Sequence, residues 1–316
     1  MKARSAEVPS VVVDARALNA SGIGRSLREI LVVLFQDDRF PHIRLLGCPR
    51  ELRAFVDGQN PANTVEVISH TGGFYSLRSQ LSWLLLCWRH LTDAEVALFP
   101  HYDAPMLALP RRSVLIIHDL IHFKVSRMFA WWRRLIAGVV FDNVVRESCR
   151  IVVTTNANRS DLLERCPTVE DKVEVVPFGV SELFFENPDS AVASPVPPGK
   201  PYILCVGNRK PHKNLISAVE VLHLLGSAYP DLLLVVAGKV YPGWERVIAR
   251  ANELFVADRV IEVEDADDAL LLHLYAGSQL LLFPSYYEGY GLPILEAMAA
   301  GTPVVASDSS SIPDIV

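Results

Sequence analysis

The sequence has few cysteines, and none lie at the spacing that binds zinc. The five cysteines among 316 residues are an odd number and lie far apart, so we expect neither a disulfide framework nor a CxxC metal site. Reduced thiols of this kind are typical of the cytoplasm. The sequence also lacks an apolar N-terminal stretch of signal-peptide length and any uncharged apolar run near the roughly 18 residues that span a bilayer. We therefore expect a cytoplasmic protein that is soluble or peripherally bound to a membrane.

Positive charge is in the minority overall, yet it dominates the first half of the chain. The net charge is −6, but residues 1–150 carry 19 Lys and Arg against 14 Asp and Glu, and residues 151–316 carry 11 against 22. An acidic chain without a recognition module argues against nucleic acid as a partner. Arg and Trp alternate in two predicted helical segments, 77–89 and 127–134. Such segments are typical of core helices with a charged edge, or of helices at a membrane interface.

Short apolar runs alternate with longer helical segments along the chain, which is the pattern of a parallel α/β sheet. In the first part we expect strands at 11–14, 43–47, 64–68, 95–99, 113–118, 151–154 and 172–176. A segment rich in proline and small residues precedes a second series, expected at 202–206, 232–237, 260–264, 280–283 and 303–306. The sequence therefore predicts two Rossmann-like, doubly wound domains, 1–186 and 202–316, joined by a linker at 187–201, with a ligand crevice between them.

The segment 285–296 contains two carboxylates, Glu288 and Glu296, on either side of a glycine-rich turn that opens a predicted helix. Eight residues of helix would separate their Cα atoms by about 12 Å and rotate them by about 80°, too far to share a proton. We therefore expect the two acids to hold different parts of one long ligand. Gly289 and Gly291 bring bare backbone N–H groups to a helix N-terminus, which is a typical phosphate site. A diphosphate flanked by hydroxyl-bearing groups would suit this arrangement.

This motif, continued by Glu296-Ala-Met-Ala-Ala-Gly-Thr-Pro-Val-Val-Ala-Ser, resembles the donor site of the retaining GT-B glycosyltransferases of family 4. The resemblance implies a GT-B fold, with two Rossmann-like domains facing across a cleft that binds a nucleoside diphosphate sugar without metal or other cofactor. It implies that Glu296 binds the ribose hydroxyls and that Glu288 contacts the transferred hexose. The backbone amides that hold the diphosphate would belong to Gly289, Tyr290, Gly291 and Leu292. An ordinary turn with two solvated glutamates is the alternative.

A basic loop, 208–214, follows the first strand of the second series and is expected to face the same crevice. Two cations there could neutralise a leaving diphosphate, and the resemblance implies that an Arg and a Lys do so. Lys213 matches the family's Lys directly. Arg209 is our candidate for the Arg, although several relatives have it at the position of His212. A solvated basic loop is the alternative.

Two motifs of the N-terminal domain resemble the same family. Gly22 and Gly24 precede a helix expected at 26–35, and they match a Gly-Ile-Gly-Arg loop that lies over the donor diphosphate and the acceptor. A bare helix-capping turn is the alternative. His118-Asp119 ends a predicted strand and matches a His-Asp pair whose His approaches the reacting carbon. A structural histidine is the alternative there.

Neither of two metal-like patterns in the sequence is expected to bind a metal. His118 and His122 have i, i+4 spacing but lack the Glu and the helical context of a zinc protease motif. Asp265-Ala-Asp267 fits a DxD pattern, yet Asp267 is better placed to cap the helix that follows. The sequence therefore predicts chemistry without a bound metal.

We expect a retaining, metal-independent hexosyltransferase whose catalytic residues are His118, Glu288, Arg209 and Lys213. The motifs resemble mannosyltransferases of bacterial O-antigen and exopolysaccharide synthesis. That resemblance implies GDP-mannose as donor and a glycan or polyprenyl-linked oligosaccharide as acceptor. It also implies front-face substitution, in which the departing phosphate accepts the acceptor's proton. The Arg and Trp segments leave peripheral contact with the inner membrane surface open as a further interaction.

Two alternatives stay open. One is a nucleotide-sugar 2-epimerase, although those enzymes lack the Glu-x7-Glu turn. The other is a truncated, non-catalytic nucleotide-sugar-binding relative, because the sequence ends at Val316, where the family usually continues for several more elements.

Overall fold

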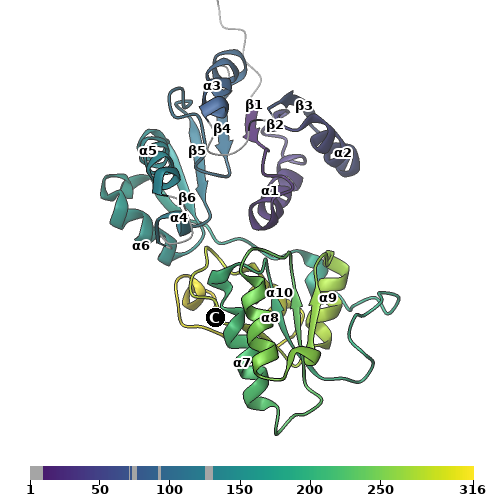
Figure 1. Ribbon diagram of the computed structural model, residues 1–316. Coiled ribbons are helices and arrows are strands. Elements are labelled where there is room, and N and C mark those ends of the chain that lie inside the picture. The colour runs from purple at the N-terminus through teal and green to yellow at the C-terminus, as the bar shows by residue number, and fades with distance from the viewer. Residues whose placement is uncertain (1–9, 71, 73–76, 92–93, 125–130) are drawn as a thin grey trace, which may run out of the picture. The chain divides into compact units, whose positions relative to one another are not determined.

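The structure is a computed structural model of the chain, and it describes residues 10–70, 72, 77–91, 94–124 and 131–316. It divides into two compact units, unit 1 (Met1–Phe178) and unit 2 (Gly179–Val316) (Figure 1). The segment 187–201, expected to be a linker, lies within unit 2, where Val196 packs into the hydrophobic core. Among the described residues, no helix combines enough length with enough apolar character to cross a membrane.

Unit 1 is built on a sheet whose seven strands, within the described residues, are all parallel and follow the order β3-β2-β1-β4-β5-β6-β7. The strands are β1 (Ser10–Asp14), β2 (His42–Gly47), β3 (Thr64–Ser69), β4 (Val96–Phe99), β5 (Ser113–Ile117), β6 (Arg150–Val153) and β7 (Val173–Val175). The α-helices are α1 (Ser21–Leu34), α2 (Pro49–Gln59), α3 (Leu77–Leu86), α4 (Ile121–Lys124), α5 (Trp131–Glu147) and α6 (Asn156–Arg165). Cys87–Leu91 forms a π-helical turn and Pro167–Lys172 a 3₁₀ turn.

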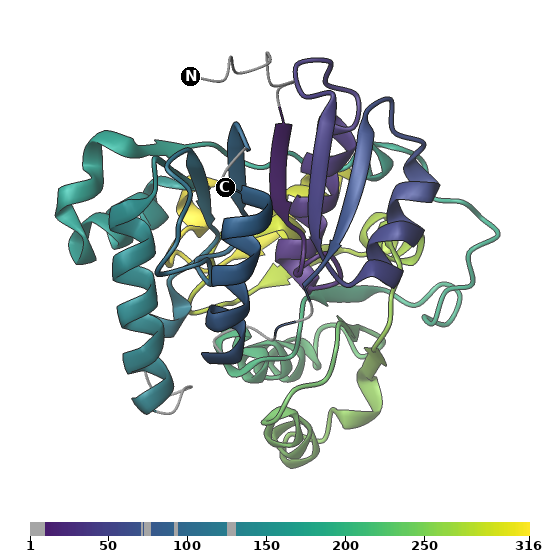
Figure 2. The same ribbon diagram turned by 90° about the horizontal axis from the view of Figure 1, so that it is seen from above.

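Both faces of the unit 1 sheet are covered because its strands are apolar on both sides. In β1, Val11 and Val13 point to the face packed by α1 and α2, whereas Val12 joins the core under α3, α5 and α6. Figure 2 shows the purple to blue strands β1, β2 and β3 side by side, with helices packed against them. The helices therefore sandwich the sheet, as the continuous apolar runs predict.

Unit 2 repeats this architecture on a smaller scale. In its described residues, five parallel strands follow the order β10-β9-β8-β11-β12. They are β8 (Tyr202–Val206), β9 (Leu233–Ala237), β10 (Val260–Val263), β11 (Leu280–Phe283) and β12 (Val304–Ala306). The helices are α7 (Leu215–Leu225), α8 (Trp244–Glu253), α9 (Asp268–Gly277) and α10 (Leu292–Ala299), with 3₁₀ turns at Glu182–Phe185, Pro211–Lys213, Ala257–Arg259 and Ile312–Asp314.

The unit 2 sheet also separates two apolar layers. Helices α7 and α8 pack with Ile203 and Cys205 of β8 on one face, while α9 and α10 pack with Tyr202 and Leu204 on the other. All twelve strands expected from the sequence form in the described residues, and each end lies within one residue of its prediction. The prediction of two Rossmann-like, doubly wound domains is confirmed.

Candidate functional site

The unit 2 sheet changes direction of winding between the adjacent strands β8 and β11. β8 leads to α7 on one face and β11 leads to α10 on the other, so the loops 207–214 and 284–291 diverge at the carboxyl edge. A hydrogen bond from the Tyr286 N–H to the His212 carbonyl, 2.8 Å long, joins them. Open α/β sheets bind ligands where strand order reverses. The basic loop and the glutamate turn therefore meet at the edge of unit 2 where a ligand is expected.

Lys213 and Glu288 are brought together at this edge. Lys213 Nζ lies 2.7 Å from Glu288 Oε1, and the two side chains are only 14% and 10% exposed. The Lys213 stem lies against Gly207, whose φ of +129° and missing side chain leave room for it, because a Cβ there would come within 3.2 Å of Nζ. The ammonium also lies 5.0 Å from the centre of the Phe283 ring. A single cation and a single carboxylate are thus held in contact.

The backbone of the glutamate turn is fixed from its C-terminal side. The hydroxyls of Ser310 and Ser311 both donate to the Glu288 carbonyl, at 2.8 and 2.9 Å. Gly291 then adopts a φ of +108° as the N-cap of α10, which lets the chain enter the helix immediately. The predicted strand-to-helix turn is confirmed, and Glu288 lies in it while Glu296 lies on the helix.

Glu296 is almost completely buried, with 1% of its surface exposed. Its Oε2 accepts a hydrogen bond of 2.8 Å from the hydroxyl of Tyr275, a buried residue of α9. This bond ties α10 to α9, so Glu296 has a clear structural role beside the predicted ligand role. A solvated glutamate, the alternative for this position, does not describe it.

Arg209 is directed away from the Lys213–Glu288 pair and toward β10. Its guanidinium pairs with Glu262, lies 4.6 Å from the centre of the Trp244 ring, and donates to the Val236 carbonyl at 3.4 Å. The Trp244 indole N–H donates to the same Glu262 carboxylate at 2.9 Å. Arg209 is only 2% exposed, so this network orders the start of the basic loop. Its assignment as a diphosphate ligand stays a prediction.

His212 is the second residue that the sequence left open for the Arg role, and it lies beside the ion pair. It is 8% exposed, and burial, followed by the charge of Lys213, lowers its pKa to about 4, so the ring is neutral near pH 7. Its Nδ1 has no hydrogen-bond partner among the described residues. The position therefore carries a neutral imidazole and no permanent cation.

Gly22 and Gly24 lie in unit 1, where the prediction of a glycine loop before the helix was wrong. Helix α1 begins at Ser21, five residues earlier than expected, so both glycines belong to its first turns. A Cβ at Gly24 would lie 2.4 Å from the Leu18 carbonyl oxygen, whereas one at Gly22 would meet nothing within 4 Å. Gly24 is therefore needed for the close approach of α1 to the preceding turn, and that contact was not visible in the sequence.

His118 follows β5 in unit 1 and is held by its surroundings. Its ring stacks on Phe178 with centroids 5.2 Å apart, and it hydrogen-bonds to the Pro100 carbonyl. Burial lowers its pKa to about 4, and its Nε2 has no partner within the described residues. Asp119 instead accepts from the Ile121 N–H at 3.0 Å and so caps the short helix α4. The predicted His-Asp pair is thus a neutral imidazole followed by a helix cap.

The sequence analysis did not single out Arg16, which lies at the carboxyl edge of unit 1 where the strand order reverses between β1 and β4. It pairs with Asp14 at 2.8 Å and Asp103 at 3.3 Å, and its guanidinium lies 4.9 Å from the Trp83 ring centre. Burial acts to lower its pKa, but the two carboxylates outweigh burial and raise it. The signal that could have found it is the run Asp14-Ala-Arg16, with two opposite charges directly after an apolar strand.

The comparisons with known proteins agree with this geometry. The family described as "Glycosyl transferases group 1" matches residues 187–316. O-antigen chain mannosyltransferase B of Escherichia coli is 36% identical over 124 residues, which are 36% of this chain and 30% of that protein. MMP alpha-(1->4)-mannosyltransferase of Mycolicibacterium hassiacum is 29% identical over 197 residues, 59% of this chain and 45% of that protein. The chain thus spans less than half the length of these relatives.

Among solved structures, HepE of Anabaena in complex with UDP and glucose superposes with a TM-score of 0.72 at 14% identity, covering 98% of this chain and 83% of that one. At this identity the likeness shows the fold alone, which is the GT-B fold of two Rossmann-like domains. The glutamate turn, the Lys213–Glu288 pair and α10 all lie inside the segment that the family matches. Residues 187–316 of this chain are therefore a glycosyltransferase group 1 domain.

Proposed function

We propose that unit 2 binds a nucleoside diphosphate sugar and that the chain transfers the sugar to a hydroxyl of a glycan or lipid-linked glycan. The observation that carries this proposal is the Lys213–Glu288 ion pair at the strand-order reversal between β8 and β11. An ammonium group suits a diphosphate, and a carboxylate suits sugar hydroxyls. The match of residues 187–316 to the group 1 glycosyltransferases supports the same reaction class.

Lys213 and Glu288 would each contact a different part of the bound nucleoside diphosphate sugar. Lys213 shifts its hydrogen bond from Glu288 to the diphosphate, and Glu288 then accepts from the hydroxyls of the hexose. Glu296 reaches the ribose hydroxyls from α10, and the turn from Gly289 to Leu292 supplies backbone amides to the diphosphate. Arg209 or His212 adds a further donor from the same loop.

The proposed reaction retains the configuration of the sugar and uses no metal. The bond between the anomeric carbon and the diphosphate oxygen breaks, and the acceptor oxygen bonds to the same face of that carbon. The departing diphosphate takes the proton of the acceptor hydroxyl. Lys213 stabilises the charge that develops on the diphosphate, a preorganised electrostatic effect of the kind that often dominates catalysis. His118, neutral near pH 7, hydrogen-bonds to the sugar or the acceptor close to the reacting carbon.

GDP-mannose is the proposed donor and a glycan or polyprenyl-linked oligosaccharide the proposed acceptor. The names of the two curated relatives, both mannosyltransferases, support the mannose. The UDP and glucose bound by HepE favour UDP-glucose as the competing donor. A direct comparison of both nucleotides decides between them.

We also propose that the chain works at the cytoplasmic face of the membrane and contacts it through α3. Leu81 and Leu85 of this helix are 66% and 72% exposed and Leu84 is 37% exposed, which gives one apolar stripe at i, i+3 and i+4. Trp83 is fully buried and belongs to the core. The second Arg and Trp segment, 127–134, lies largely outside the described residues. Leu81→Gln together with Leu85→Gln should reduce cosedimentation with vesicles of anionic phospholipid, and unchanged binding would contradict this contact.

The proposal is tested by calorimetric titration with GDP, GDP-mannose, UDP and UDP-glucose in the presence of a chelator. One nucleotide series should bind, and Glu296→Gln should weaken its binding by about 1–3 kcal/mol, the usual effect of losing a buried charged acceptor. Product analysis then separates the alternatives. A transferase forms product only with an acceptor, a 2-epimerase forms product without one, and a non-catalytic relative binds without turnover. Absence of binding to all four nucleotides would overturn the donor-site assignment.

A further inference from the structure

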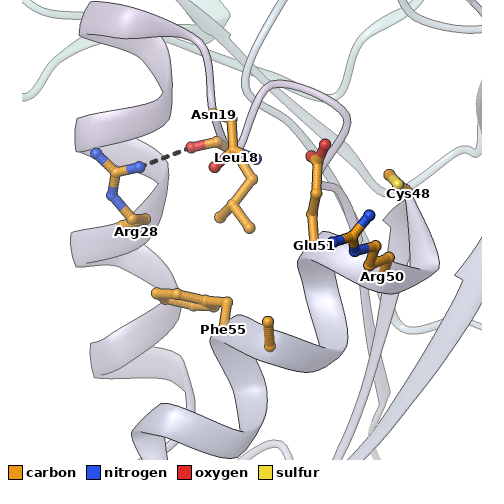
Figure 3. A pocket seen from close by; sticks show the side chains of 8 residues that line it. Leu18, Asn19, Arg28, Cys48, Arg50, Glu51 and Phe55 are labelled. Atoms are coloured by element: carbon orange, nitrogen blue, oxygen red, sulfur yellow. Dashed lines mark hydrogen bonds between the residues drawn. The ribbon is translucent and has the colours of Figure 1, made fainter. Parts of the chain in front are cut away.

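Unit 1 contains a pocket that none of the proposed donor-site residues lines. It lies between the start of α1 and the start of α2 and is called here the α1–α2 pocket (Figure 3). Its lining includes Leu18, Arg28, Cys48, Arg50, Glu51 and Phe55. Its volume is about 620 Å³, within the range of about 300–1,000 Å³ that small-molecule sites occupy. The pocket is therefore large enough for a monosaccharide that carries one substituent.

The base of the pocket is apolar and held in place. Leu18 is 2% exposed and belongs to the core between the helices and the sheet. The Phe55 ring packs against the buried ring of Phe35, with centroids 6.0 Å apart, while Phe55 also lines the pocket. Figure 3 shows Phe55 and Leu18 between the two helices. A fixed aromatic and aliphatic surface of this kind suits the C–H face of a sugar ring.

Two arginines line the pocket from different helices. Arg28 on α1 donates from Nη1 to the Leu18 carbonyl at 3.0 Å, which holds its guanidinium beside the pocket (Figure 3). Arg50 stands on the first turn of α2. In the described part of the chain, neither forms an ion pair. Because a guanidinium has five N–H donors, most of the donors of both arginines remain available to a ligand.

The start of α2 adds to this positive potential. Its N-cap, Cys48, forms no capping hydrogen bond, and Pro49 occupies the first turn. The helix therefore presents the positive end of its dipole to the pocket. Glu51 opposes this effect, so the charged lining consists of two cations and one anion, a net charge of +1. A single negative group on the ligand balances that charge.

We propose that the α1–α2 pocket binds an anionic hexose, with the ring on Leu18 and Phe55 and the acidic group between Arg28 and Arg50. The acidic group is a phosphate or a carboxylate, since both accept several N–H donors from arginine. The link to catalysis rests on the proposed function: the anionic hexose would be part of the acceptor glycan. The binding itself does not depend on that function.

Cys48 provides a direct assay because its thiol lines the pocket. Cys149 is exposed elsewhere on unit 1, whereas Cys87, Cys166 and Cys205 are buried. We would follow alkylation of Cys48 and Cys149 by iodoacetamide with mass spectrometry, in the presence of glucose 6-phosphate, glucuronate, glucose or inorganic phosphate. The two anionic sugars should slow the alkylation of Cys48 and leave that of Cys149 unchanged. Comparison of glucose 6-phosphate with glucuronate identifies the preferred acidic group.

Three variants test the two arginines. Arg28→Gln and Arg50→Gln should each raise the sugar concentration needed for half protection by about tenfold to a hundredfold, the usual effect of losing a charged hydrogen bond. Arg53→Gln is the matched control, because Arg53 is an exposed residue of α2 that does not line the pocket. If Arg28→Gln fails to fold, Arg50→Gln decides the test, because Arg50 is exposed at the surface.

Three outcomes of these experiments would overturn the proposal. If glucose protected Cys48 as well as the anionic sugars do, the negative group would be unnecessary for binding. If inorganic phosphate protected Cys48 equally well, the sugar ring would be unnecessary. Equal loss in Arg53→Gln would point to general charge attraction. Protection of Cys48 in a protein that binds no nucleotide would support the pocket proposal and contradict only the donor-site proposal. The two proposals can therefore be distinguished experimentally.

Discussion

Lys213 and Glu288 join the loop after β8 to the loop after β11 through an ion pair of 2.7 Å. Each side chain is mostly shielded from water, so each charge depends on the other for its solvation. A ligand that takes the hydrogen bonds of Lys213 must also supply partners for Glu288. A sugar diphosphate does both, since it offers phosphate oxygens to the ammonium and hydroxyls to the carboxylate.

The contributions of Lys213 and Glu288 to stability should be coupled. Lys213→Met alone and Glu288→Gln alone should each lower the free energy of unfolding by about 1–3 kcal/mol, because each leaves a shielded group without its partner. The double variant should lose less than the sum of the two. Urea unfolding of all four proteins measures the coupling energy.

The exposed pair Lys200–Asp231 is the control for that cycle. Its side chains are 44% and 68% exposed, so its coupling energy should lie within about 0–1 kcal/mol. Equal coupling energies for the two pairs would contradict the special role given to shielding at Lys213 and Glu288.

Two glycines two residues apart on α1 should respond to alanine in opposite directions. Gly24→Ala places a Cβ 2.4 Å from the Leu18 carbonyl oxygen, so the helix must move, and we expect a loss of about 1–3 kcal/mol. Gly22→Ala meets nothing within 4 Å and should be neutral or stabilise by up to about 1 kcal/mol through helix propensity. Thermal unfolding of both variants checks this, and a destabilised Gly22→Ala would point to a contact that the structure does not describe.

Asp267 should act as a helix cap and not as a metal ligand. Its carboxylate accepts from the Leu270 N–H at 2.8 Å at the start of α9. Asp267→Ala should therefore lower stability by about 0.5–2 kcal/mol, while Asp267→Ser should retain most of it. Nucleotide affinity measured with Mn²⁺ or with a chelator should be the same in all three proteins. A manganese-dependent affinity that Asp267→Ala abolishes would restore the DxD interpretation.

Acidification should destabilise the fold before the carboxylates titrate. Burial is the largest effect on His70, His118 and His212, and it lowers the pKa of each to about 4 in the folded chain. Unfolded histidines titrate near pH 6.5, so between about pH 6.5 and pH 4 the unfolded state binds more protons and stability falls as pH falls. Each histidine contributes at most about 1.4 kcal/mol per pH unit.

Urea unfolding between about pH 7 and pH 5 measures this slope. His70→Asn should make the slope shallower because one of the buried imidazoles that cause it is gone. A stability that stays constant or rises on acidification would contradict the burial of these imidazoles.

The strands were predictable from sequence because a parallel sheet buried on both faces needs continuous apolar runs. The apolar run of β11 also located the strand-to-helix turn that contains Glu288 and precedes Glu296. The start of α1 was not predictable because glycine normally disfavours a helix, and Gly24 lies in this one because it packs closely against the Leu18 carbonyl. That contact joins residues whose packing no local pattern encodes.

The ion pairs of the site were predictable only in part. Lys213 could be placed at the same crevice as Glu288 because both follow strands at the carboxyl edge of a Rossmann-like sheet, but the ion pair between them was not predicted. Arg209 has the same position relative to β8, yet it pairs with Glu262, since Trp244 and Glu262 form a partly enclosed site for its guanidinium. The sequence shows where the charged residues lie along the chain, but it does not show which carboxylate each cationic side chain contacts.

The most direct test of the donor site is the affinity of Lys213→Met for the best-binding nucleotide sugar, with Lys200→Met as control. Lys213→Met should weaken binding at least about tenfold, the usual effect of losing a charged hydrogen bond to phosphate, and Lys200→Met should bind like the unaltered chain. Equal affinity of the two variants would contradict the account, because the diphosphate would then bind away from Lys213 and Glu288.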